Sequence, residues 1–166
     1  VALVVIVRWP LMIASRISFY ILSPPKKQLA FVCQLILTVL AKSEDSIIVV
    51  AASDLLSSLD DRLWSLSDVA FIPHQIIQQL DAFYHQKLPA SVVLTDNIEL
   101  ITQFDGVVIN LTNEAIVDTQ ASRLLEVIDA APEQVESGRH KYRIYQTQLQ
   151  AMATSSPPAI QVFQIP

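Results

Sequence analysis

The stretch Ile47-Ile48-Val49-Val50-Ala51-Ala52 decides the fold of this chain. It is a continuous apolar run, rich in β-branched residues and of the length expected of a strand covered on both faces of a sheet. A polar break at 44–46 precedes it, and Ser53 follows it as a candidate helix cap. Leucines then recur at helical spacing as far as Trp64. The stretch therefore predicts a buried strand that leads directly into a helix.

The residues upstream repeat this order. Ile17–Leu22 is rich in β-branched and aromatic residues and predicts the first strand. Ser23 and the two prolines after it predict a turn and a helix start, with Ser23 as the cap. Residues 28–41 are apolar on nearly every helical face, which is typical of a helix buried on several sides. Strand, helix, strand and helix in succession favour a parallel α/β sheet.

The downstream half extends the same pattern. Two further strands are predicted over 89–95 and 105–111, and helical spacing predicts a helix over 76–84. A second helix is predicted to start at Thr112 or Asn113 and to carry apolar residues up to Ile128 toward the core, and the last helix starts near Pro132. Residues 159–165 fit either an edge strand or mobile chain. The whole predicts a three-layer, Rossmann-like α/β domain with a mostly parallel sheet flanked by helices.

Composition limits the classes of function. The chain has 166 residues, of which 52% are hydrophobic and 16% charged, so it can bury a core as one domain. A net charge of −5 argues against broad electrostatic binding of nucleic acid, which needs a surplus of Lys and Arg. The only glycines are Gly106 and Gly138, too few for a Gly-rich nucleotide loop. A single cysteine, Cys33, allows no internal disulfide and fits a reducing compartment.

Residues that would perform chemistry are scattered. His74 and His85 are isolated, without a second ligand at the spacing of a metal site. Asp60 and Asp61 are adjacent on the predicted helix, so their carboxylates face different directions. Cys33 lies in an apolar run and is interpreted as a small buried hydrophobe. We therefore predict no catalytic residues, no metal and no cofactor.

Two clusters indicate binding instead. The first runs from Leu59 to Trp64 and continues, after a polar gap, with Val69 to His74 (VAFIPH). Its distinctive residues are large and apolar, and they lie where a chain usually reaches the surface. Exposed aromatic and proline side chains are typical anchors for a protein partner. The alternative is that Trp64 and Phe71 belong to the core.

The second cluster is Gly138 to Tyr145 (GRHKYRIY), which holds three of the eleven Lys and Arg residues within five positions. Helical geometry places Tyr142 on an apolar face, with Arg139 and Arg143, spaced i and i+4, along its edge. Such an edge suits an acidic peptide with an apolar end, because Arg binds carboxylates with two hydrogen bonds while a neighbouring hollow takes the apolar residue. The alternative is an ordinary solvated basic face.

Both clusters resemble the chi subunit family of bacterial DNA polymerase III, whose members are accessory proteins of the clamp loader. Leu-Trp with a later Phe-Ile-Pro-His, and Arg-x-x-Tyr-basic-x-Tyr on the last helix, occur in the family's order over about Ile17 to Tyr145. The resemblance implies a cytoplasmic, non-catalytic adapter, monomeric within a hetero-complex and associated with DNA polymerase activity only as part of the holoenzyme. Its partners would be the psi subunit and the acidic C-terminal tail of single-stranded DNA-binding protein, with DNA contacted only indirectly.

The resemblance also implies the site residues. The expected contacts with the psi subunit are Trp64, Phe71 and Pro73. The expected contacts with the acidic tail are Arg139, Tyr142 and Arg143, with Ala131 as a pocket wall. The segment between Pro132 and Arg139 is shorter than in the family, which bears on affinity for the tail.

We interpret residues 1–15 as an apolar N-terminal extension or a start assigned too far upstream, 16–149 as the chi-like α/β domain, and 150–166 as a C-terminal tail. The first segment is too short for a membrane span, which needs about 20 apolar residues. Two other functions remain open: a small α/β enzyme that binds a nucleotide at the carboxyl ends of its strands, and an interaction domain tethered to a membrane by residues 1–14.

Overall fold

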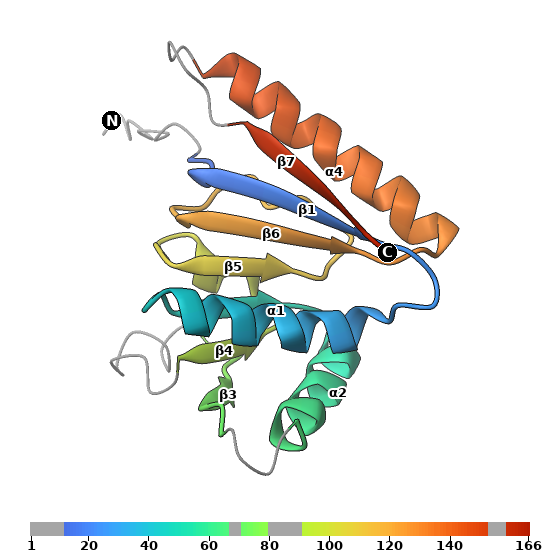
Figure 1. Cartoon of the computed structure of the whole chain (residues 1–166). Helices are drawn as coiled ribbons and strands as arrows, with labels where there is room; N and C mark the ends of the chain where they lie inside the picture. The colour runs from blue at the N-terminus through green and yellow to red at the C-terminus, as the bar shows by residue number, and fades with distance from the viewer. Residues whose placement is uncertain (1–11, 67–70, 80–90, 153–158) are drawn as a thin grey trace, which may run out of the picture.

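A parallel sheet forms the middle layer of the molecule (Figure 1). The computed structural model describes residues 12–66, 71–79, 91–152 and 159–166. Within these residues seven strands pair in the order β3-β4-β2-β5-β6-β1-β7, and every pair is parallel. The strands are β1 Arg16–Leu22, β2 Ile47–Val50, β3 His74–Ile76, β4 Val92–Thr95, β5 Val107–Asn110, β6 Arg123–Ile128 and β7 Ile160–Ile165. The predicted three-layer α/β fold is confirmed.

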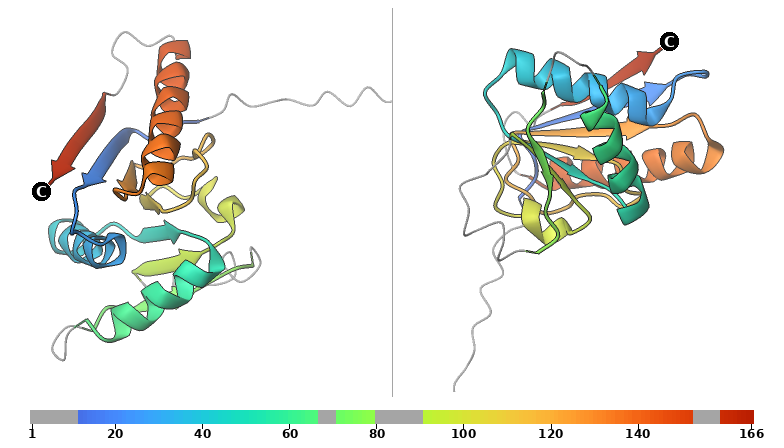
Figure 2. Two further views of the ribbon diagram at one scale, coloured as in Figure 1. Left: turned by 90° about the vertical axis from the view of Figure 1, so that its right-hand side faces the viewer. Right: turned by 90° about the horizontal axis from the view of Figure 1, so that it is seen from below.

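Helices cover both faces of this sheet. The helices α1 (Gln28–Lys42) and α2 (Ser53–Trp64) pack on one face, and α4 (Pro132–Ala151) packs on the other with the short 3-10 helix η1 (Ile98–Ile101). Figure 2 shows α1 and α4 on opposite sides of the strands. Because β2, β4 and β5 are buried along their whole length, apolar residues occupy nearly all of their positions, the exceptions being Thr95 and Asn110 at the carboxyl ends of β4 and β5. None of the helices in the described residues is long and apolar enough to cross a membrane.

The predicted helix from Thr112 or Asn113 to Ile128 is wrong. Residues 111–122 form a loop, and Arg123–Ile128 is the strand β6 between β5 and β1. Leu124 and Ile128 face α4, whereas Leu125 and Val127 face α1. The leucine and isoleucine spacing fits a helix as well as a strand covered on both faces, so periodicity alone could not separate the two.

Three smaller predictions also fail. Ser53 does not cap α2, because it is the first residue of that helix, whose N-cap is Ala52 without a side-chain capping bond. Ser23 does not cap α1, which begins at Gln28 with Lys27 as its N-cap and without a side-chain capping bond. The predicted helix over 76–84 is contradicted at its start, because β3 ends at Ile76 and 77–79 are irregular, while 80–84 and His85 lie outside the described residues. Most of the segment 1–15 also lies outside them.

The C-terminal segment takes the edge-strand alternative. β7 pairs in parallel with β1, from Ile17 opposite Ile160 to Leu22 opposite Ile165. The backbone N–H of Ser23 donates to the carbonyl of Ile165 at 2.9 Å, which continues the ladder beyond the strand. One edge strand of the described sheet therefore comes from the segment after α4, and β3 forms the other edge.

Candidate functional site

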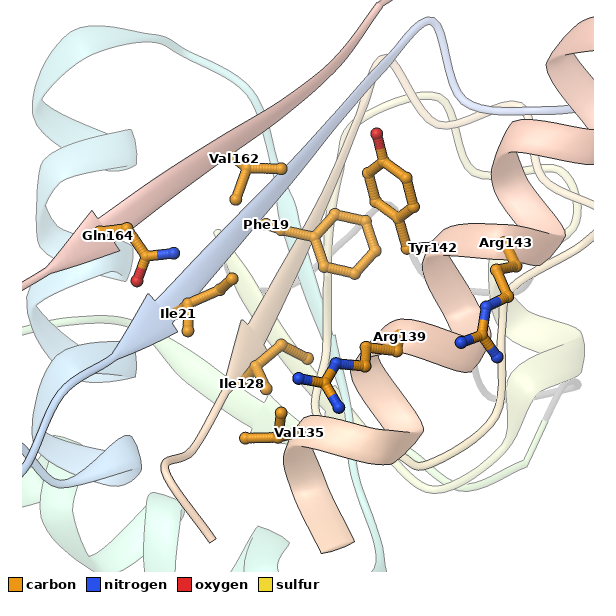
Figure 3. Close-up of a pocket in the computed structure, with 10 residues that line it drawn as sticks. Phe19, Ile21, Ile128, Val135, Arg139, Tyr142, Arg143, Val162 and Gln164 are labelled. Atoms are coloured by element: carbon orange, nitrogen blue, oxygen red, sulfur yellow. The ribbon is translucent and has the colours of Figure 1, made fainter. Parts of the chain in front are cut away.

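A pocket of about 370 Å³ lies between α4 and the strands β6, β1 and β7 (Figure 3). The strands contribute mostly apolar side chains, and α4 contributes the cations. Its lining residues are Phe19, Ile21, Ile128, Val162 and Gln164 from the strands, and Val135, Gly138, Arg139, Tyr142 and Arg143 from α4.

The floor of the pocket depends on a close approach of α4 to the sheet. Gly138 is buried against β6, and a Cβ at this position would lie 3.0 Å from Cδ1 of Ile128. The ring of Tyr142 stands edge-on to the buried ring of Phe19, with centroids 5.6 Å apart. A small residue on the helix and an aromatic pair beside it thus leave an apolar hollow between helix and strands.

Two guanidinium groups border this hollow. The Arg139 side chain is 66% exposed and lies 3.7 Å from the equally exposed carboxylate of Glu136. An exposed pair of this kind contributes little, so it leaves Arg139 available to another anion. Arg143 is exposed one turn further along α4. The pocket can therefore bury a small apolar group while its rim binds carboxylates.

A buried polar network holds α4 on the sheet behind the pocket. Lys141 and Glu126 form a fully buried ion pair, and Lys141 Nζ also donates to the Thr112 carbonyl at 2.9 Å. The Glu126 Oε1 atom accepts from the hydroxyl of Tyr145 at 2.6 Å and from Asn110 Nδ2 at 2.8 Å. The carboxylate is thus bonded on both oxygens, as a buried charge requires.

Tyr145 shows how strongly the network is buried. Its hydroxyl also accepts from the backbone N–H of Ile116 at 2.9 Å. Burial, the adjacent charge of Glu126 and the hydrogen bond to that carboxylate together raise the pKa of Tyr145 far above its ordinary value. The hydroxyl therefore stays protonated and donates to Glu126, which helps to fix the helix that carries Arg139 and Arg143.

The cluster around Trp64 lies at the opposite edge of the sheet, where α2 meets β3. Trp64 at the end of α2 is 59% exposed and Phe71 is 70% exposed, and their ring centroids lie 5.6 Å apart. The ring of His74 packs against Trp64 at 4.8 Å, and its side chain is fully buried. His74 Nδ1 bonds the Ile72 carbonyl at 2.7 Å, so the imidazole supports the tryptophan from behind. Pro73 is exposed beside this aromatic pair.

These observations can be set beside known families. The family model described as "DNA polymerase III chi subunit, HolC" matches residues 14–152 of the 166 residues. The chain belongs to the chi subunit family. No curated protein sequence matches the chain. The chi family match begins just before β1 and ends just after α4, so that β7 lies beyond the matched residues.

The structure brings together three of the four residues that the resemblance to the chi family assigned to the acidic tail. Arg139, Tyr142 and Arg143 all line the pocket. Ala131 is not a lining residue, since it is the half-buried N-cap of α4. The third basic residue of the cluster, Lys141, is buried in the network with Glu126 and does not belong to the exposed cationic edge.

Local spacing in the sequence does not indicate the strand residues that line the pocket or the buried network behind it. The spacing predicts Glu126 on a helix, and nothing in it marks this residue as the partner of a lysine fifteen residues later. Val162 and Gln164 were placed in a segment that fitted either strand or mobile chain. A carboxylate inside an otherwise apolar run was the one available signal, because Glu is almost never fully buried without a partner.

The carboxyl ends of the strands form a different pocket, of about 510 Å³. Among the described residues that line it, Asp54 and Asp96 carry charge and none is Lys or Arg. The hydroxyl of Ser53 donates to Asp96 at 2.7 Å, and this hydrogen bond lowers the pKa of the carboxyl group. A carboxylate therefore stands beside the N-terminus of α2, where a bound nucleotide would place its phosphates. The electrostatics of this pocket do not favour the nucleotide-binding alternative.

Proposed function

We propose that this chi-family chain is a non-catalytic adapter of DNA replication in the cytoplasm. The family is an accessory subunit family of DNA polymerase III. In the proposal, a psi-like subunit of the clamp loader binds at Trp64, Phe71 and Pro73. The acidic C-terminal tail of single-stranded DNA-binding protein binds at Arg139, Tyr142 and Arg143.

The observation that carries the proposal is the pocket beneath α4. It combines an apolar floor of Phe19 and Ile128 with two guanidinium groups on its rim, in a chain whose net charge is −5. A locally cationic site on an acidic protein attracts an acidic peptide without attracting nucleic acid generally. The hollow supplies the second requirement, a place for the apolar residue at the end of the peptide.

The aromatic pair supports the second half of the proposal. Trp64 and Phe71 expose a large apolar area and are braced by a buried histidine, so they are held in place before a partner arrives. Aromatic anchors of this kind contribute much of the binding energy of protein interfaces. An exposed pair on a helix end therefore suits a protein partner better than a small ligand.

The positions of the two surfaces suit an adapter. The two surfaces lie on opposite faces of the sheet and near its opposite edges. The aromatic pair is carried by α2 and the segment before β3, and the pocket is formed by α4, β6, β1 and β7. Five strand spacings separate β3 from β1, which is roughly 24 Å. Both partners can thus bind at once, and the adapter raises the local concentration of one at the other.

The test is the fluorescence anisotropy of a labelled acidic peptide, the C-terminal tail of the same organism's single-stranded DNA-binding protein. We expect saturable, salt-sensitive binding that Arg139→Ala weakens by about 1–3 kcal/mol, as expected for the loss of a charge-assisted contact. Arg62→Ala is the matched control, because it removes the same charge from an exposed residue on α2. Equal affinities of wild type, Arg139→Ala and Arg62→Ala would contradict the assignment.

A further inference from the structure

The strand β7 has two faces with different neighbours. Val162 and Gln164 line the pocket beneath α4. Phe163, between them, stacks on Tyr20 on the other face of the sheet, with ring centroids 5.3 Å apart and an interplanar angle of 19°. Because side chains alternate along a strand, Gln161 shares the face of Phe163. One strand therefore carries two exposed glutamines, one in the pocket and one on the opposite face.

Gln164 lies across the pocket from the cations of α4. Figure 3 shows Val162 and Gln164 on β7 at one side of the hollow and Arg139 and Arg143 on the helix at the other, with Ile21 and Ile128 between them. Gln164 is exposed, and within the described part of the chain its side-chain amide makes no hydrogen bond. The pocket thus has one cationic wall and one neutral wall that ends in an unengaged amide.

The two walls bind different groups. Guanidinium groups only donate hydrogen bonds, so the helix wall selects carboxylates. A glutamine amide both donates and accepts, which matches the N–H and C=O of a peptide bond. An extended peptide that places its apolar end in the hollow and its carboxylates on the arginines passes beside β7.

We propose that β7 is the second wall of the peptide site and that Gln164 binds the main chain of the acidic peptide opposite Arg139. This inference rests on the proposed function and deepens it. It assigns a specificity role to residues beyond those matched by the chi family. The arginines select charge, whereas Gln164 selects an extended main chain next to the apolar end.

The two glutamines of β7 provide a matched experiment. The variants are Gln164→Glu and Gln164→Lys, with Gln161→Glu and Gln161→Lys as controls that change the net charge equally on the other face of the same strand. Affinity for the labelled acidic peptide is measured by anisotropy in about 0.15 M salt, where the Debye length is about 8 Å and distant charges are screened. Thermal unfolding of each variant confirms that the exposed substitutions leave the fold intact.

We expect effects of opposite sign at position 164 alone. Gln164→Glu removes the amide donor and places a carboxylate against an acidic ligand, and it should weaken binding about tenfold or more. Gln164→Lys keeps a hydrogen-bond donor and places a positive charge against the acidic ligand, so it should increase affinity and steepen its salt dependence. Both Gln161 variants should stay within about twofold of wild type.

The outcomes separate this inference from the proposed function. If wild type binds the peptide and the substitutions at 161 and 164 have equal effects, β7 is not a wall of the site and only this inference fails. The same holds if Gln164→Glu binds as wild type does. If wild type itself does not bind the peptide, the proposed function fails and this inference fails with it.

Discussion

The pocket beneath α4 and the Trp64–Phe71 pair are surfaces of opposite shape. The pocket is a hollow whose walls come from three strands and a helix, whereas the two aromatic rings project from a helix end and the segment before β3. A hollow admits only a ligand that is narrow enough and carries the matching charge. The projecting rings of Trp64 and Phe71 need a partner whose own surface has a matching pocket. In the proposed function, selectivity for the peptide would be built into this chain, and selectivity for the second partner would reside largely in that partner.

The supports of the two surfaces differ as well. Behind the pocket lies the buried pair of Lys141 and Glu126, which binds α4 to β6. Behind Trp64 lies the ring of His74, whose Nε2 is 3.1 Å from a carboxylate oxygen of Asp60 without the alignment of a hydrogen bond. Removing one member of a buried charged network leaves its partner charge unpaired and costs much stability. Packing between rings leaves no unpaired charge when one ring is changed, so the loss of stability is smaller. The following substitutions test this contrast.

The largest effect is expected from Lys141→Met. It leaves the Glu126 carboxylate buried without its cation, which should lower the free energy of unfolding by about 3–5 kcal/mol. Denaturant unfolding measures this loss, and Lys42→Met, on the exposed end of α1, is the control. Below the unfolding transition, affinity for the acidic peptide should fall more than affinity for the partner at Trp64. Unchanged stability would show that the network does not hold α4.

An intermediate effect is expected from Trp64→Ala. Removing the larger aromatic anchor should weaken binding of a psi-like partner by about 2–4 kcal/mol, measured by titration calorimetry. Affinity for the acidic peptide should change by less than about 0.5 kcal/mol, because distant sites without shared contacts are independent. Ile98→Ala, on η1, is the control for loss of an exposed apolar side chain. Equal losses for both ligands would mean that the two surfaces are coupled.

The smallest effect concerns Asp96 at the N-terminus of α2, the helix that ends in Trp64. The pKa of Asp96 is lowered, chiefly by the hydrogen bond from Ser53. The ionised carboxylate therefore stabilises the fold at pH values above the unfolded pKa of about 3.9. This stabilisation is lost as the pH falls through the lower pKa of the folded state. Asp96→Asn should therefore be slightly less stable than wild type at pH 7, and the difference should be smaller at pH 3, which lies below the unfolded value. Thermal unfolding at both pH values measures it, and a constant difference would contradict the assignment.

How far the sequence predicts each surface follows from the kind of interaction involved. Trp64, Phe71 and Pro73 are close in the chain, so a local pattern was enough to group them, and their exposure fits an anchor rather than the core alternative. The strands β1, β2, β4 and β5 were also readable, because each is a short apolar run bounded by polar or turn residues.

The sequence predicted only the part of the pocket that lies on α4. Spacing on one helix predicted the positions of Arg139, Tyr142 and Arg143, but not the burial of Lys141 between them. Whether a lysine faces solvent or a buried carboxylate depends on the strand across from it, and β6 was assigned to a helix. The contribution of β7 depended on its pairing with β1, a contact between opposite ends of the described chain that local periodicity does not encode.

The pairing of β7 with β1 also sets an order in time. A ribosome makes the chain from its N-terminus, and α2 and β3, which carry Trp64 and His74, are complete long before Ile160 is added. The pocket wall cannot form until Ile160–Ile165 has been made and has found β1, a contact with a long loop to close. A nascent chain, or one cleaved after α4, would thus offer the aromatic surface to its partner while still unable to hold the acidic peptide fully. In the proposed function, the chain could therefore bind its protein partner through Trp64 and Phe71 before it could bind the acidic peptide.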